Sequence, residues 1–202
     1  GMYKHVLVVG AETLSRILNW QDRNTCILFG DGAGAAVLGP VEEGYGILSV
    51  DLGANGAGGQ YLTMPAGGSR KPASEETVAN HEHCIHMVGK EVFKFAVKVM
   101  GHSALAALEK AGMGKEDIDL LIPHQANQRI IDSAAKRLKL STDKIFVNLE
   151  KYANTSAASI PIALCQARDA GRIHKGENVV MVGFEECRQH YRHPEKVIVT
   201  GT

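Results

Sequence analysis

The sequence predicts an α/β fold, because short apolar runs alternate with longer segments of helical period. Two runs have the length of buried strands: Ile118–Ile122, which Pro123 ends because proline offers no N–H to a ladder, and Asn178–Phe184. Between them, apolar residues recur at helical spacing after His124 and again over 156–170. We therefore expect a sheet with helices packed against it.

The first half of the chain adds further elements of both kinds. Val6–Val9 and Cys26–Phe29 are apolar enough to predict two buried strands, and Gly44–Asp51 predicts another. Val88–Lys110 has the apolar spacing of an amphipathic helix. Residues 53–86 are rich in glycine, proline, serine and charge, which favours a long irregular connection.

Bulk composition excludes several classes of protein. Among 202 residues, 22 basic and 22 acidic side chains cancel, so no net charge favours nucleic acid or a membrane surface. No apolar run approaches the roughly 20 residues that span a bilayer. The four cysteines, Cys26, Cys84, Cys165 and Cys187, show no paired spacing, as in reduced cytoplasmic proteins. A cytoplasmic protein that binds neither nucleic acid nor membranes is expected.

Two motifs invite a cofactor or metal assignment that the sequence argues against. Gly30–Ala35 matches the dinucleotide fingerprint G-x-G-x-x-A, but Gly39–Pro40 follows too soon for the helix that would hold a pyrophosphate. These glycines instead suit close backbone approach in a strand. The histidines and cysteine of 81–86 fit no standard zinc spacing, and Cys187, His190 and His193 offer only three ligands, so no metal is expected.

His124 and Asn154 are the candidate catalytic residues. His124 follows the strand Ile118–Ile122, and Asn154 follows the strand-like run Ile145–Leu149, each just before a helix. Ligands of open α/β folds bind at the carboxyl ends of strands. Two neutral hydrogen-bond donors that converge there could stabilise an enolate or oxyanion. On spacing alone, a structural histidine and a helix-capping asparagine are equally good interpretations.

Four motifs favour the catalytic interpretation, because in order they resemble β-ketoacyl-acyl-carrier-protein synthase III. They are Phe29–Leu38, Gly89–Val97, Pro123–Ile130 and Asn154–Pro161, and the resemblance runs from Gly1 to about Phe184. It implies a thiolase-like α/β fold, with the end of the first half at 1–51, an irregular connection at 52–86 and most of the second half at 87–184.

The resemblance implies a decarboxylative Claisen condensation of an acyl-coenzyme A primer with malonyl-acyl carrier protein, in a homodimer without a permanently bound cofactor. The family's nucleophilic cysteine has no counterpart here: Cys26 opens an expected strand, Cys165 lies in an expected helix, and Cys84 and Cys187 lie in polar segments. The open alternatives are a non-catalytic module for dimerisation or carrier-protein binding, and another thiolase-superfamily condensing enzyme.

Other site residues follow from the resemblance alone. Coenzyme A would contact Arg23, and its pantetheine arm would contact Gly89, Phe93, Ala126 and Asn127. The carrier protein would meet a basic patch of Lys94, Arg129, Lys136 and Arg137, which without the resemblance would be a solvated helix face. After Phe184 the polar segment 185–202 departs from the family's glycine turn until Val197–Val199, so we expect a divergent tail or a changed reading frame, and Glu185 and Glu186 weaken the expected oxyanion hole.

Overall fold

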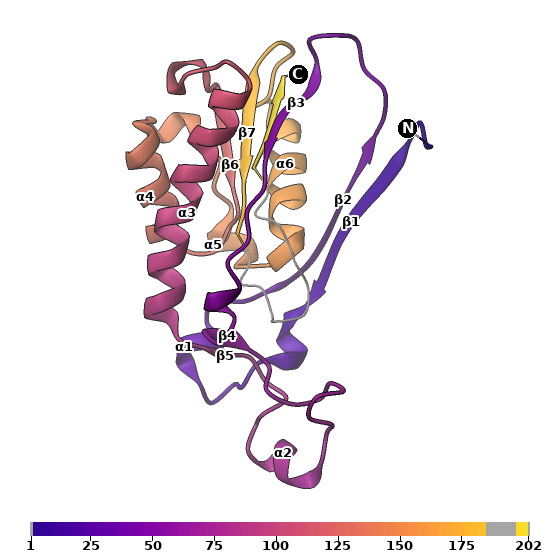
Figure 1. Cartoon of the computed structure of the whole chain (residues 1–202), viewed down its shortest axis with the longest axis vertical. Coiled ribbons are helices and arrows are strands. Elements are labelled where there is room, and N and C mark those ends of the chain that lie inside the picture. The colour runs from indigo at the N-terminus through magenta and orange to yellow at the C-terminus, as the bar shows by residue number, and fades with distance from the viewer. Residues whose placement is uncertain (1, 185–196, 202) are drawn as a thin grey trace.

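A computed structural model describes residues 2–184 and 197–201, with side chains through residue 184. The elements form successive layers (Figure 1): helices α3 and α4, a four-stranded sheet, helix α6, and a two-stranded ribbon beyond α6. The layered arrangement confirms the predicted α/β class. Among the described residues, no helix is long and apolar enough to cross a bilayer.

The central sheet has the strand order β3-β8-β7-β6. Strands β6 (Leu120–Pro123) and β7 (Asn178–Val182) run parallel, while β8 (Val197–Gly201) pairs antiparallel with β7 and with β3 (Gly46–Asp51). The strands expected at 118–122, 178–184 and 44–51 are thus confirmed, with ends shifted by a few residues, whereas β8 lies within the segment expected to be a divergent tail. The remaining tail, 185–196, lies outside the described residues, as do the expectations that rest on it.

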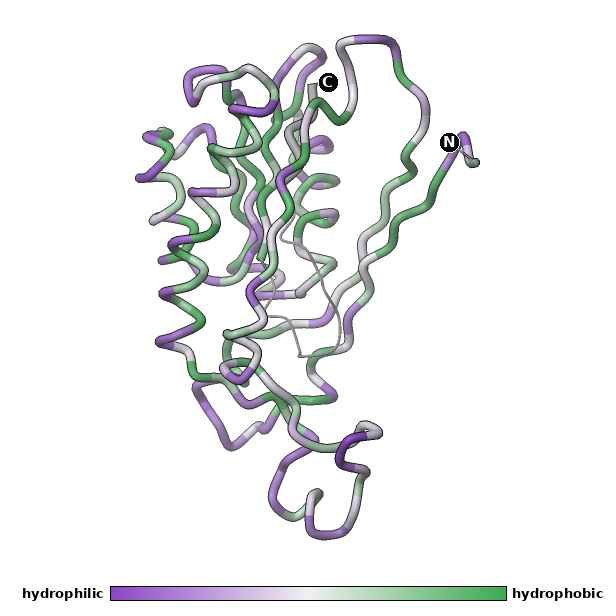
Figure 2. The backbone as a smooth tube through the Cα atoms, in the orientation of Figure 1, coloured by the Kyte–Doolittle hydropathy of each residue, from purple (hydrophilic) through white to green (hydrophobic). Residues whose placement is uncertain are grey.

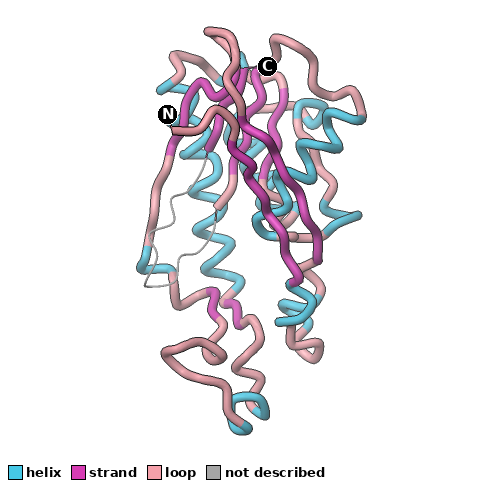
Figure 3. The backbone as a smooth tube through the Cα atoms, turned by 90° about the vertical axis from the view of Figure 1, so that its right-hand side faces the viewer, coloured by secondary structure: helices cyan, strands magenta, loops and turns pink. Residues whose placement is uncertain are grey.

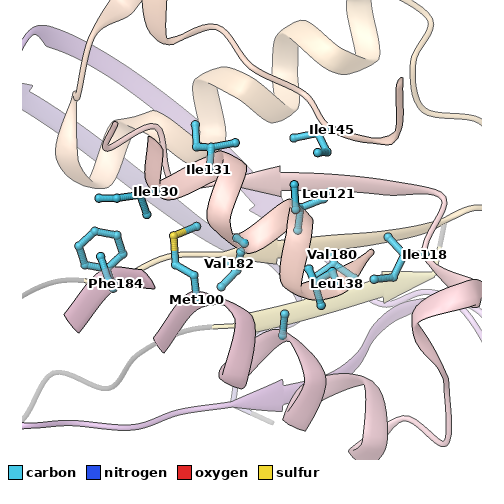
Figure 4. Packing of buried hydrophobic residues seen from close by; sticks show 14 of the residues in the cluster. Met100, Ile118, Leu121, Ile130, Ile131, Leu138, Ile145, Val180, Val182 and Phe184 are labelled. Atoms are coloured by element: carbon cyan, nitrogen blue, oxygen red, sulfur yellow. The ribbon is translucent and has the colours of Figure 1, made fainter. Parts of the chain in front are cut away.

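Alternate side chains of β6 and β7 enter two different cores, because successive residues of a strand point to opposite faces. Leu121 and Val180 face helices α3 (Gly89–Lys110) and α4 (Gln128–Leu138). Figure 4 shows them beside Met100 and Ile131 of these helices. Leu120 and Val179 face α6 (Ser159–Asp169) on the other side. Helices α3 and α4 confirm the helices predicted over Val88–Lys110 and after His124. Helix α6 confirms the one predicted over 156–170, and Gly171, with φ of 65°, follows its end.

The ribbon pairs β1 (Val6–Thr13) antiparallel with β2 (Asp31–Leu38). Its inner face is lined by small residues, and a Cβ added at Gly10 would lie 2.5 Å from the carbonyl oxygen of Ala157. A Cβ added at Gly30 would lie 2.5 Å from the carbonyl oxygen of Tyr152, and one added at Gly34 would lie 3.0 Å from the backbone nitrogen of Ile162, so the prediction of close backbone approach at the glycines of 30–35 is confirmed. The prediction that Val6–Val9 is buried is wrong: these side chains are 46–65 % exposed, because they extend past α6 and no other described element covers them. In Figure 2 much of β1 is green, the colour of hydrophobic residues.

Two expected strands are wrong: both segments are mostly turn or irregular backbone next to a short helix. Cys26–Phe29 was expected to be extended, but Asp22 caps helix α1 (Arg23–Cys26) by accepting from the N–H of Asn24, and Phe29 alone forms a bridge. Likewise, 145–149 forms only the bridge Leu121–Ile145 between the 3-10 turn η4 (Thr142–Lys144) and helix α5 (Leu149–Tyr152). The side chain of Gln125 accepts from the N–H of Asn148 and so replaces a ladder partner.

The connection 52–86 is irregular, as predicted, but it contains short ordered pieces. These are the 3-10 turn η2 (Gly56–Gly58), helix α2 (Glu75–Ala79), and the paired strands β4 (Leu62–Thr63) and β5 (His86–Met87). A reciprocal capping box between Ser74 and Thr77 starts α2. Figure 3 shows this lobe extending from the end of α3. The other 3-10 turns are η1 (Leu14–Ile17), η3 (Lys115–Asp117) and η5 (Ser156–Ala158).

Candidate active site

His124 is placed by the carboxyl end of the parallel strand pair β6–β7. Its N–H donates to the carbonyl of Val182 (2.7 Å), which continues the ladder one residue beyond Pro123. The side chain of Gln125 then turns back to donate to the carbonyl of Pro123 (2.8 Å). The backbone on both sides of the imidazole is therefore held by hydrogen bonds, as predicted for a residue at a strand-to-helix junction.

The imidazole of His124 is 7 % exposed and has a defined partner on one nitrogen. Nδ1 lies 2.5 Å from Oγ of Ser159, at the first turn of α6. The edge-to-face contact with Phe184, at 5.5 Å between ring centroids, fixes the ring plane. Burial lowers the pKa of His124 from 6.5 to about 4, because desolvation disfavours the imidazolium. His124 is therefore neutral near pH 7.

Asn154 is placed by the ribbon end of the molecule. Its N–H donates to the carbonyl of Leu28 (2.9 Å), and its own carbonyl accepts from the N–H of Gly30 (2.9 Å). The side-chain Oδ1 accepts from the N–H of Ser156 (2.9 Å), which leaves the amide N–H groups as the end that can serve a ligand. The expectation that a strand precedes Asn154 is wrong, since α5 and Ala153, at φ 57°, precede it.

Both candidate catalytic residues line one cavity of about 780 Å³. Its wall includes Phe29, Asn154 and Ser156 from the ribbon side, and His124 and Phe184 from the sheet side. Apolar side chains of η1, β4 and α3 form much of the remainder, and Lys90 and Arg129 add positive charge. A volume of this size accommodates a small-molecule arm, and His124 and Asn154 present neutral polar groups to it.

The other predicted site residues divide into two groups. Gly89, Phe93, Ala126 and Asn127 all line the cavity, although the Oδ1 of Asn127 also caps α4 through the N–H of Arg129. Arg23 does not line it; the neighbouring Asn24 does. Of the basic patch, Arg129 lines the cavity and stacks over Phe93 at 5.0 Å, whereas Lys94 pairs with Glu91 at 2.8 Å.

Lys136 and Arg137 of the same patch are exposed on α4 and lie outside the cavity wall. The side-chain stem of Arg137 lies where a Cβ of Gly101 would be, so it packs against α3 as well as facing solvent. These two residues can meet a partner only at the surface.

No cysteine of the described chain lines the cavity. Cys26 is half-buried, Cys165 is exposed on α6, and burial raises the pKa of the Cys84 thiol, which disfavours the nucleophilic thiolate. Cys187 lies outside the described residues. The described residues also contain no cluster of three or more histidine, cysteine or carboxylate side chains that could hold a metal.

Ser159, Phe184 and Gly30 are site residues that sequence reasoning did not single out. Each acts through a neighbour: Ser159 and Phe184 contact His124, and Gly30 bonds Asn154. For Ser159, the one available signal was that a polar residue occupies an inward-facing position of the helix expected over 156–170. Phe184 and Gly30 carry no signal of this kind, since both continue apolar or glycine-rich runs.

Comparisons with known proteins point to one family. Two family models match in order: 3-Oxoacyl-[acyl-carrier-protein (ACP)] synthase III at residues 1–56 and its C-terminal model at residues 108–186. The beta-ketoacyl-[acyl-carrier-protein] synthase III of Desulfitobacterium hafniense is 65 % identical over 184 residues, which are 91 % of this chain and 56 % of that protein. The corresponding enzyme of Clostridioides difficile is 59 % identical over 184 residues, with the same coverage. The chain thus spans little more than half the length of these curated relatives.

Solved structures extend the comparison to the whole fold. The synthase III of Thermus thermophilus superposes with a TM-score of 0.86 at 45 % identity and covers 100 % of this chain and 60 % of that one. The priming beta-ketosynthase of the R1128 polyketide pathway superposes with a TM-score of 0.80 at 33 % identity, covering 98 % and 57 %.

The layered fold is that of the thiolase-like condensing enzymes. Within that class the paired family models are decisive. The chain belongs to the 3-oxoacyl-[acyl-carrier-protein] synthase III family.

Proposed function

We propose that the cavity performs the enolate-forming half of the synthase III reaction. The carboxylate of a malonyl thioester leaves as carbon dioxide, and the electron pair of the broken C–C bond forms an enolate. His124 and Asn154 donate hydrogen bonds to the oxygen where this charge develops. In the whole reaction the enolate attacks an acyl group held as a thioester, which initiates fatty acid biosynthesis.

One observation carries this proposal: two neutral polar side chains line the same cavity, and each has one of its polar atoms already engaged. Nδ1 of His124 is bonded to Ser159, and Oδ1 of Asn154 is bonded to the N–H of Ser156. Burial keeps His124 neutral near pH 7. A neutral donor can stabilise the oxyanion without surrendering its proton to it, which suits repeated enolate formation.

The shape and charge of the cavity wall support thioester substrates. The pantetheine arm of acyl-coenzyme A or of malonyl-carrier protein would lie along Gly89, Phe93, Ala126 and Asn127. Arg129, stacked on Phe93, would meet the phosphate or the acidic carrier protein, with Lys94, Lys136 and Arg137 on the adjoining surface. Arg23 would contact coenzyme A from outside the wall. Coenzyme A acts here as substrate, without a permanently bound cofactor, in a cytoplasmic homodimer.

A non-catalytic role in carrier-protein binding or dimerisation is the second candidate. The observation that favours it is that none of Cys26, Cys84 and Cys165 lines the cavity. A binding module would need the basic surface but not the two donors. Enolate formation itself requires no cysteine, so the two functions can be separated by experiment.

The test is carbon dioxide release from malonyl-coenzyme A by the purified chain. We expect release that falls by about a hundred- to a thousand-fold in His124→Ala and in Asn154→Ala. His102→Ala, at an exposed position of α3, is the matched control and should retain the full rate. Equal rates in the chain and in both site variants would contradict the proposal and favour the binding role.

A further inference from the structure

The hydrogen bond between His124 and Ser159 can run in either direction, because the imidazole Nδ1 and the hydroxyl can each donate or accept. A neutral imidazole carries one N–H, and only one of its two nitrogens can donate. If Nδ1–H donates to Ser159, the remaining nitrogen Nε2 is an acceptor and cannot stabilise an oxyanion. If Ser159 donates to Nδ1, the proton resides on Nε2. The tautomer of His124 therefore decides whether it can act as a donor.

The environment of Ser159 selects one direction. Ser159 is 2 % exposed, and among the described residues its hydroxyl has one partner, Nδ1 of His124. If Nδ1 were the donor, the hydroxyl proton of Ser159 would be buried without an acceptor, which is an unfavourable arrangement. If the hydroxyl donates to Nδ1, its proton is satisfied, and Nε2–H remains for the cavity.

The remaining surroundings of the ring are compatible with the same direction. Phe184 packs edge-to-face on the imidazole and orients it. The phenyl ring has no nitrogen or oxygen atom that would stabilise one tautomer of His124 over the other. His124 stays neutral near pH 7 because of its burial, so its ring carries a single N–H at that pH. The cavity side of the ring is the side where a substrate oxygen can accept from Nε2.

We propose that Ser159 is a positioning residue that holds His124 in its Nε2–H tautomer by donating its hydroxyl proton to Nδ1. The catalytic part of this inference rests on the proposed enolate-stabilising function. The tautomer itself is a property of the unliganded chain. His124 and Asn154 belong to sequence motifs, whereas Ser159 meets His124 because the start of α6 packs beside the end of β6.

Nitrogen NMR of the intact 202-residue chain, with ¹⁵N-labelled histidine, tests the assignment directly. Long-range proton–nitrogen correlation distinguishes a protonated from an unprotonated ring nitrogen, and the signals of His124 are identified by their loss in His124→Gln. We expect a protonated Nε2 and an unprotonated Nδ1 near neutral pH. An Nδ1–H tautomer in the wild-type chain would overturn the proposal without any variant.

Two substitutions sharpen the test. Ser159→Ala should shift the nitrogen signals toward a mixture of tautomers and lower carbon dioxide release about ten-fold, less than loss of the donor itself, because part of the population keeps Nε2–H. Ser159→Thr retains the hydroxyl and should restore the wild-type pattern. Ser133→Ala on α4 is the control. An unchanged spectrum in Ser159→Ala would contradict the proposal.

The nitrogen spectrum tests the tautomer and carbon dioxide release tests the proposed function, so failure of one proposal can be told from failure of the other. If the tautomer depends on Ser159 but His124→Ala retains carbon dioxide release, the proposed function is wrong and the tautomer assignment stands. If release depends on His124 and the ring carries Nε2–H in both the wild-type chain and Ser159→Ala, the proposed function stands and Ser159 has no such role.

Discussion

The β1–β2 ribbon and the β3-β8-β7-β6 sheet are both built from apolar strands, yet only the sheet is enclosed. Leu121 and Val180 are fully buried between helices, whereas Leu7 and Val37 of the ribbon are 65 % and 69 % exposed. The difference lies in what covers each strand: α3, α4 and α6 enclose the sheet, whereas the ribbon packs mainly on α6 and η5 among the described elements. An apolar run thus predicts a strand more reliably than it predicts its burial.

The site lies where these two regions meet, and each contributes one donor. His124 is held by the sheet through Val182 and by α6 through Ser159. Asn154 is held by Leu28 and Gly30, at the base of the ribbon. We infer that His124 has the stability of the enclosed core, and that Asn154 depends on the less enclosed ribbon.

The largest contrast is expected in the free energy of unfolding. Leu121→Ala opens a cavity in the enclosed core and should cost about 2–5 kcal/mol. Val37→Ala, on the exposed face of the ribbon, should change the free energy by less than about 0.5 kcal/mol. Urea denaturation of the two variants measures the difference. Comparable losses would mean that the ribbon is as enclosed in solution as the sheet.

The pH dependence of stability isolates the His124 side of the comparison. Since the folded-state pKa of about 4 lies below the ordinary 6.5, the unfolded chain takes up the proton first as the pH falls. The contribution of neutral, buried His124 to the free energy of unfolding is fully present above about pH 6.5. It is lost as the pH falls toward 4, at up to about 1.4 kcal/mol per pH unit.

Urea denaturation near neutral pH and at about pH 5 measures this loss. His124→Gln should lose less stability on acidification than the wild-type chain, while the exposed His102→Gln should follow the wild type. Identical acid sensitivity in all three chains would show that His124 is not buried as a neutral group.

Gly30→Ala tests the ribbon side of the site. A Cβ there would lie 2.5 Å from the carbonyl oxygen of Tyr152, so the backbone that bonds Asn154 must move. We expect a loss of about 1–3 kcal/mol in stability and reduced carbon dioxide release. Gly68→Ala is the matched control, because no atom lies within 4 Å of its added Cβ. Unchanged release in Gly30→Ala would show that Asn154 does not depend on the ribbon.

The smallest effect concerns association through the ribbon. Leu7 and Val37 are paired across the two strands on the outward face, and an exposed apolar strand pair favours self-association. We expect the chain to associate or dissolve poorly, and the double variant Leu7→Lys, Val37→Glu to be less associated in light scattering. A monodisperse, monomeric wild-type chain would contradict this expectation.

Much of the sheet and the long helices could be predicted from residue pattern, because their apolar periods are uninterrupted. The strands expected at Cys26–Phe29 and Ile145–Leu149 could not, since side-chain bonds from Asp22 and Gln125 replaced the ladder partners that a strand would need. The same limit applies to the site. His124 stands beside an informative proline, but its contact with Ser159 joins residues 35 positions apart and leaves no local pattern.

Enolate formation at His124 and Asn154 requires no nucleophilic cysteine among the described residues. Intact mass spectrometry after incubation with acetyl-coenzyme A, followed in the same sample by carbon dioxide release from malonyl-coenzyme A, examines both halves of this statement together. We expect an unmodified mass and carbon dioxide release that depends on His124. A stable acetyl adduct on Cys26, Cys84 or Cys165, or no release at all, would contradict it.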